Sequence, residues 1–297
     1  MVYRLLIIIA TLIWGFSFVV VKDVTGALGP SWILVVRFLM AAVILFAVFY
    51  PQKEKRRLFF TREYLGYGAV LGCALFFAYW LQTIGITDTT PGKNAFLTAC
   101  YCVIVPFISW AFTKRRPGGI KVFAAVLCVA GISLMSFQPG EGFSLSGGDW
   151  FTLACSFFYA LHIVLVATIS QGRDIYVLTT WQFFFLGIIA LIPALLFEQV
   201  PAWGALSSQT WEGLCFLGIA CSAVALLFQN VGQAHLPAAS AAILLSLESP
   251  FGVMFSVAFG AETLTPTIIC GFVVIFAAIL VSELVPMLIE DRKKNSA

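Results

Sequence analysis

One acidic residue stands well inside an apolar stretch of this chain. Glu248 lies about ten residues into the run Ala238–Gly260, two residues before Pro250. At a rise of about 1.5 Å per residue, it would lie near the middle of a hydrocarbon layer about 30 Å thick. A bare carboxylate is costly there, so Glu248 is protonated, hydrated or paired. We interpret it as a ligand for a substrate amine or as a proton-coupling site. The alternative is a structural hydrogen bond that fixes the helix where Pro250 interrupts its backbone ladder.

One basic residue also falls within an apolar stretch. Arg37 lies in the outer third of the run Trp32–Tyr50, from where its long side chain could reach the headgroups. It could bind an anionic group of a substrate, or it could pair with an acid such as Asp23. The short reach to the headgroups favours the structural pairing.

Polar and aromatic residues recur at helical spacing in three apolar stretches. They are Thr11, Trp14 and Ser17 in the first, Asn94, Thr98, Tyr101 and Val105 in the second, and Ser156, Tyr159 and His162 in the third. A helix in lipid must turn such a face towards its neighbours, which predicts a cavity walled by aromatic rings and suited to an amphipathic small molecule. The predicted substrate-binding residues are Trp14, Ser17, Tyr79, Gln82, Asn94, Thr98, Tyr101, Tyr159, His162, Gln229 and Glu248. Glu248 and His162 are also the coupling candidates. The alternative is that these residues only pack, since Phe alone occurs 29 times.

Two pairs of amide and hydroxyl residues suggest a vestibule at each face of the membrane. Gln82 with Asn94 is expected towards the outside, and Gln229 with Ser240 towards the inside. The alternative is that the two glutamines cap helix ends. Glycines at positions 68 and 72 form a small-xxx-small pattern, which predicts close helix packing rather than a site.

The composition defines the elements that must position these residues. Apolar residues make up 61% of the 297 residues and charged residues only 10%, so the chain is predicted to be a multi-pass membrane protein. The run that begins in Met1–Val24 lacks a small-residue cleavage site and is expected to be a retained first span. All eight cysteines fall in apolar runs without a C-x-x-C pair, which favours packing over metal or disulfide chemistry.

Ten apolar runs are predicted to be membrane-spanning helices, which makes the fold all-α. They are Leu5–Val21, Trp32–Tyr50, Leu65–Ile86, Asn94–Phe112, Ile120–Phe137, Trp150–Ile169, Tyr176–Phe197, Trp211–Val231, Ala238–Gly260 and Thr267–Val285. With the N-terminus inside, 14 of the 17 Lys and Arg residues face the cytoplasm and only Lys22 and Lys93 face outside. Both termini are therefore predicted to be cytoplasmic.

The two halves of the chain resemble each other. Gln82–Pro106 and Gln229–Pro250 each carry Gln-x-x-Gly, a proline-bearing turn and a further apolar helix that reaches a proline. Because five spans are an odd number, the second copy would cross the membrane in the opposite sense, as in inverted-repeat transporters. We predict a first repeat over residues 1–137, an external linker over 138–148 and a second repeat over 149–297.

This pattern resembles the drug/metabolite transporter superfamily, specifically its EamA-type members with ten helices in two repeats. The residues that carry the resemblance are LIWGFSFVVVK at Leu12–Lys22, RFLMAA at Arg37–Ala42, TTPGKNAFLT at Thr89–Thr98 and SLESPFGVMFSVAFGAETLT at Ser246–Thr265. The resemblance implies a bacterial inner-membrane protein that exports small metabolites such as amino acids. It also implies a central cavity lined by the first, third, fourth, sixth, eighth and ninth spans.

Other classes of function fare worse on the sequence. The chain lacks H-E-x-x-H, G-x-S-x-G and Walker motifs, so we expect neither an enzyme nor an ATP-driven pump, and no cofactor or metal. The expected partners are a small-molecule substrate and the lipid bilayer, without nucleic acid. A homodimer is compatible with the sequence, and a monomer is sufficient. The competing hypothesis is an intramembrane enzyme or lipid-handling protein that uses Glu248 and His162 as an acid–base pair. A sugar-nucleotide carrier would need more basic residues than Arg37 in its cavity.

Overall fold

Helices account for every regular element in the part of the chain that the structure describes. This structure is a computed structural model, and it describes residues 1–114, 116–136 and 146–260, with isolated positions from 263 to 285. The first half contains α1 (Val2–Thr25), α2 (Pro30–Phe49), α3 (Lys53–Phe59), α4 (Arg62–Thr87), α5 (Pro91–Ala99), α6 (Tyr101–Thr113) and α7 (Gly119–Ser136). The second half contains α8 (Gly147–Ile169), α9 (Ile175–Phe197), η1 (Trp203–Ala205), α10 (Ser208–Phe216), η2 (Leu217–Leu226), α11 (Leu227–His235), α12 (Ala238–Leu245) and α13 (Glu248–Ala258).

Eight of the predicted spans coincide with helices that are long and apolar enough to cross a membrane. These helices are Val2–Thr25, Pro30–Phe49, Arg62–Thr87, Pro91–Thr113, Gly147–Ile169, Ile175–Phe197, Ser208–His235 and Ala238–Ala258. The fifth predicted span corresponds to α7, whose apolar part Gly119–Gly131 is shorter. The linker at 138–148 and the C-terminus lie largely outside the described residues, and the tenth predicted span is described only in part.

Two of these membrane-length helices are interrupted near their middle. The fourth span breaks at Cys100, between α5 and α6, and the ninth breaks at Ser246 and Leu247, between α12 and α13. The break at Ser246 and Leu247 lies one turn before Pro250, whose ring clashes with the carbonyl of the preceding turn, while Pro106 lies inside α6, six residues after Cys100. As a result Tyr101 and Glu248 each become the first residue of a new helix in the middle of the bundle.

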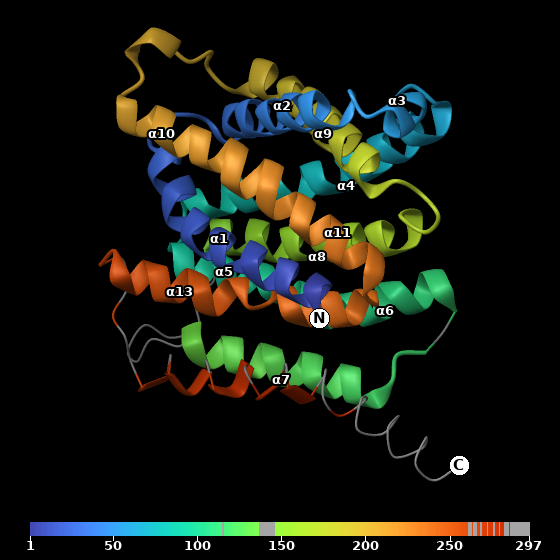
Figure 1. Ribbon diagram of the computed structural model, residues 1–297. Coiled ribbons are helices and arrows are strands. Elements are labelled where there is room, and N and C mark those ends of the chain that lie inside the picture. The colour runs from blue at the N-terminus through green and yellow to red at the C-terminus, as the bar shows by residue number, and fades with distance from the viewer. Residues whose placement is uncertain are drawn as a thin grey trace.

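The helices lie side by side, with α2 and α9 along one edge of the bundle and α7 along the other (Figure 1). We name the two ends of the bundle by their lysines. At the Lys93 end, the carboxylate of Glu198, just after α9, accepts hydrogen bonds from the amides of Ser31 and Trp32 on α2. At the Lys121 end, the side chain of Lys121 donates a hydrogen bond to the hydroxyl of Ser240.

Glycines allow α4 to lie directly against α9, as the small-xxx-small pattern predicted. A Cβ atom on Gly72 would stand 2.7 Å from the carbonyl oxygen of Gln182 and 3.1 Å from the amide nitrogen of Leu186. An added Cβ on Gly68 would meet the side chain of Trp181. This prediction is confirmed, and the contact fixes the helix that carries Tyr79 and Gln82 to the bundle.

Candidate functional site

A small buried cavity lies at the centre of the bundle and collects most of the predicted binding residues. Its volume is about 30 Å³, which is room for about two water molecules. It is lined by Trp14, Ser17, Phe18, Val21, Arg37, Tyr79, Gln82, Thr83, Ile86, Asn94, Tyr101, Tyr159, Ile163, Gln229, Leu245 and Glu248. All six spans that the resemblance implied contribute to this lining, and the second span adds Arg37.

Arg37 points into this cavity rather than towards the membrane surface. Its side chain is 2% exposed, and its Nε donates to the hydroxyl of Ser222 at 3.0 Å. Its guanidinium carbon lies 4.9 Å and 4.7 Å from the ring centroids of Phe38 and Tyr79, distances typical of cation–π contacts. The expected pairing with Asp23 is therefore wrong: Asp23 is exposed, and aromatic faces and a hydroxyl hold the guanidinium inside.

The hydroxyl that holds Arg37 comes from an unusual stretch of helix. Residues Leu217–Leu226 form a π-helical segment, η2, between α10 and α11. Such wide turns often occur at functional sites because they shift side chains and carbonyls out of the ordinary helical register. The Cys221 carbonyl in the same segment accepts a 3.0 Å hydrogen bond from Trp14 Nε1. This segment thus positions two residues that line the cavity, Arg37 and Trp14. The indication of it in the sequence was Ser222, a serine in an apolar run.

Glu248 faces the same cavity from the break in the ninth span. Its side chain is 7% exposed, and its Oε1 atom accepts no hydrogen bond from the described residues. The hydroxyl of Tyr101 interacts electrostatically with the Glu248 carboxyl. The positive end of the α13 dipole also favours an acid at this position.

The cavity therefore contains one basic and one acidic side chain that do not form an ion pair with each other. Among the described residues, neither Arg37 nor Glu248 takes part in an ion pair, and Arg37 Nη2 has no hydrogen-bond partner. Tyr79 lies within electrostatic range of both charges. Unsatisfied buried ionisable groups are costly, which makes these two side chains candidates for binding a polar ligand.

A chain of amide and hydroxyl groups lines one wall of the cavity. Tyr159 donates to Gln82 Oε1 at 2.8 Å, and Gln82 Nε2 donates to Thr98 Oγ1 at 3.0 Å. Asn94 Nδ2 donates to Thr152 Oγ1 at 2.8 Å and to the Gln82 carbonyl at 3.3 Å. Thr98 does not line the cavity itself, but it orients Gln82, which does.

Some predicted placements are wrong. Gln229 lines the same cavity as Gln82 and Asn94, so these residues do not belong to two separate vestibules. Neither glutamine caps a helix end, because α4 runs five residues beyond Gln82 and α11 runs to His235.

His162 is the one predicted binding residue that neither lines the central cavity nor hydrogen-bonds to a residue that lines it. Its side chain is completely buried and interacts with Gln182 on α9, and it does not line the cavity. The polar face of α8 is wide, and only its Tyr159 edge points at the centre. The structure therefore does not bring the proposed acid–base pair of Glu248 and His162 together around the cavity.

A second and larger cavity opens at the Lys121 end. Its volume is about 810 Å³, within the range of small-molecule sites, and its lining includes Arg116, Lys121 and His235. None of the described residues that line it is acidic. It shares no lining residue with the central cavity.

An apolar helical bundle with a buried polar cavity at its centre defines a multi-pass membrane protein built to handle a small molecule. The model of the EamA-like transporter family matches residues 1–137 and 146–284. The chain belongs to this family. The resemblance seen in the sequence is therefore confirmed.

Curated relatives carry the names of transporters rather than of enzymes. An "Uncharacterized transporter" of Archaeoglobus fulgidus is 32% identical over 286 residues, covering 92% of this chain and 83% of its own. Human "Solute carrier family 35 member F4" is 25% identical over 141 residues, covering 46% of this chain and 27% of its own. A solved structure titled "Crystal structure of protein" has a TM-score of 0.80 at 16% identity, covers 97% of this chain and 98% of that chain, and so shares the fold. The chain is a membrane transporter by family.

Proposed function

We propose that this transporter moves small zwitterionic metabolites, amino acids above all, out of the cell across the inner membrane. The observation that carries the proposal is the buried cavity in which Arg37 and Glu248 stand without a direct ionic partner among the described residues. An amino acid presents a carboxylate and an ammonium group at the same time. The guanidinium of Arg37 can bind the carboxylate through charge-assisted hydrogen bonds, and Glu248 can bind the ammonium.

The walls of the cavity suit the remainder of such a molecule. Trp14, Phe18 and Tyr79 offer aromatic surface, and Gln82 and Asn94 offer amide groups. A single ion–polar contact contributes about 1.5–3 kcal/mol, so two such contacts supply much of a micromolar affinity. The alternative, in which these aromatic residues only pack, does not explain why Arg37 and Glu248 are buried beside them.

The proposed mechanism is alternating access, with the two halves of the chain rocking about this cavity. A cavity of about 30 Å³ is too small for an amino acid, so the bundle must open to load it. The cavity of about 810 Å³ at the Lys121 end is the proposed cytoplasmic vestibule. The separate family matches to residues 1–137 and 146–284 support the two-repeat division.

A substrate screen in proteoliposomes tests the zwitterion directly. The panel pairs each neutral amino acid with two analogues of the same side chain, one lacking the carboxylate and one lacking the amine. We expect the amino acid to move and both analogues to move poorly. Chemical conversion of a compound without its movement would instead support an intramembrane enzyme.

Two substitutions separate the roles of the charged residues. In Arg37→Gln, discrimination against the analogue without a carboxylate should disappear, and in Glu248→Gln, discrimination against the analogue without an amine should disappear. Glu248→Gln should also remove any pH dependence that this carboxyl confers. The matched controls are Arg62→Gln and Glu54→Gln, whose residues are exposed and distant from the cavity. Unchanged selectivity in both cavity variants would refute the assignment.

The proposed orientation is tested by cysteine labelling. Ser207→Cys lies before α10 at the predicted outer face, and Gln171→Cys lies after α8 at the predicted inner face. An impermeant thiol reagent applied to intact cells should label the first variant and not the second. The opposite pattern would invert the topology.

A further inference from the structure

The two ends of the bundle are closed to different degrees. The Lys121 end contains the cavity of about 810 Å³. At the Lys93 end, polar contacts join α1, α4, α5 and α8. These contacts lie directly above the central cavity, because Ile86 and Asn94 belong to its lining. We call the set formed by Lys22, Asp88, Lys93, Asn94, Asp149 and Thr152 the polar gate.

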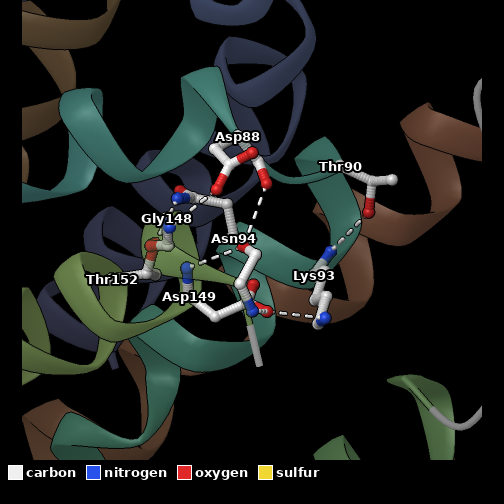
Figure 2. A network of polar contacts seen from close by, with 8 residues as sticks. Asp88, Thr90, Lys93, Asn94, Gly148, Asp149 and Thr152 are labelled. Atoms are coloured by element: carbon white, nitrogen blue, oxygen red, sulfur yellow. Dashed lines mark hydrogen bonds and ion pairs between the residues drawn. The ribbon is translucent and has the colours of Figure 1, made fainter. Parts of the chain in front are cut away.

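An ion pair joins α5 to α8 within the polar gate. Lys93 Nζ lies 2.7 Å from Asp149 Oδ2, and the Asp149 side chain is completely buried (Figure 2). The same oxygen accepts a hydrogen bond from the amide of Ser146, which caps α8. The carboxylate of Asp88, at the end of α4, accepts a 3.0 Å hydrogen bond from the backbone amide of Gly148. Both acids thus hold the beginning of α8 against its neighbours.

A second cation closes the gate from α1. Lys22 Nζ donates to the carbonyl oxygens of Ile86, Thr87 and Thr89 at 2.8–3.0 Å. The last carbonyls of a helix lack intrahelical partners, so a cation placed there is stabilising. These two lysines are the only basic residues that the sequence predicts on the outer face.

Asn94 belongs to both the polar gate and the central cavity. Its side-chain nitrogen holds Thr152 on α8, while its oxygen has no hydrogen-bond partner although the side chain is completely buried (Figure 2). Thr152 is itself anchored to the Gly148 carbonyl at 2.8 Å and does not line the cavity. Asn94 is therefore a side chain that belongs both to the cavity lining and to the polar gate.

We propose that Asn94 couples occupancy of the central cavity to opening of the Lys93 end. A substrate that hydrogen-bonds to the Asn94 amide takes the place of Thr152, so α5 loses one of its polar attachments to α8. The state without the Asn94–Thr152 contact then binds substrate better, which is the differential affinity that any ligand-driven transition requires. This role of Asn94 rests on the proposed transport function. It makes the polar gate the part of the transporter that opens at the Lys93 end.

The native residue Cys155 reports whether the gate is open. It lies one turn beyond Thr152 on α8, is completely buried, and has its sulfur 3.6 Å from the Thr98 hydroxyl. A membrane-impermeant thiol reagent is applied to intact cells and, separately, to inverted membrane vesicles. The Cys155→Ala variant gives the labelling that comes from the other cysteines. A mixture of neutral amino acids serves as the substrate probe.

Two variants separate coupling from simple loosening. In Thr152→Val, we expect Cys155 labelling without amino acids to rise about fivefold, the population change that one net hydrogen bond corresponds to. Amino acids should then add little more. In Lys93→Gln, basal labelling should also rise, but amino acids should raise it further, because Asn94 still holds Thr152. The control Thr180→Val loses only a hydroxyl bonded to the Tyr176 carbonyl on α9, and should label like the wild type.

The outcomes distinguish this inference from the proposed function. If both gate variants label like the wild type while amino acids are transported, the gate inference fails and the transport proposal stands. If amino acids raise labelling equally in Thr152→Val and in the wild type, the coupling role of Asn94 is refuted. If the gate variants label faster but no amino acid moves, the gate stands and the substrate proposal fails. Labelling only in inverted vesicles would place the Lys93 end inside and overturn its assignment as the outer gate.

Discussion

A single methyl group should have opposite effects on stability at two glycines of α4. Gly66 has no atom within 4 Å of the position that a Cβ would take, whereas the Cβ of Gly72→Ala would press on the Gln182 carbonyl at 2.7 Å. The atoms that it meets on α9 are backbone atoms and a Cβ atom attached directly to the backbone, so they cannot rotate away. The two helices must move apart instead.

The magnitude follows from the two environments. Overpacking of this kind costs about 1–3 kcal/mol, while alanine gains up to about 1 kcal/mol over glycine in an open helical position. Gly72→Ala should therefore be less stable than Gly66→Ala by about 1–4 kcal/mol. The assay is thermal unfolding of the purified variants in one detergent, followed by tryptophan fluorescence. Equal stability of the two variants, or a less stable Gly66→Ala, would refute the close packing of α4 on α9.

Two further predictions concern particular hydrogen bonds. Tyr159→Phe removes the 2.8 Å bond to Gln82 and should raise the KM for transport about fivefold without changing thermal stability much, because the ring remains against Tyr79. A KM equal to that of the wild type would show that this bond does not position Gln82. Asp174 both caps α9, through the amides of Tyr176 and Val177, and pairs with Lys55 at 3.0 Å. Asp174→Ala should therefore lower stability by about 1–2 kcal/mol and Asp174→Asn by less than about 1 kcal/mol, with the reverse order in thermal unfolding contradicting the cap.

The sequence was sufficient for the helices because lipid leaves a backbone few choices. Apolar runs of about twenty residues must satisfy their own hydrogen bonds, which makes them helices wherever they occur. It also indicated a disturbed helix at Pro250, and the break at Ser246–Leu247 lies about one turn before that proline. The break at Cys100 lies nearly two turns before Pro106 and was not predicted.

The sequence indicated the depth of some residues but not of all, and it did not indicate rotation about a helix axis. Glu248 was expected near the middle and lines the central cavity, whereas Arg37 was expected in the outer third of its span and lines the same cavity. His162 has a suitable depth and yet faces Gln182, since a polar stripe covers a wide arc and packing selects which part of it faces the cavity.

The composition and the apolar runs of this chain thus determined a multi-pass helical protein, its motifs indicated the family by resemblance, and its polar stripes indicated most residues of the central cavity. Only the tertiary structure decided the partners of the charged residues. Arg37 meets Ser222 across 185 residues of chain, and Lys93 meets Asp149 at the start of another helix. Such pairs depend on how whole helices cross and twist, which is a property of the packed bundle rather than of any one stretch of sequence.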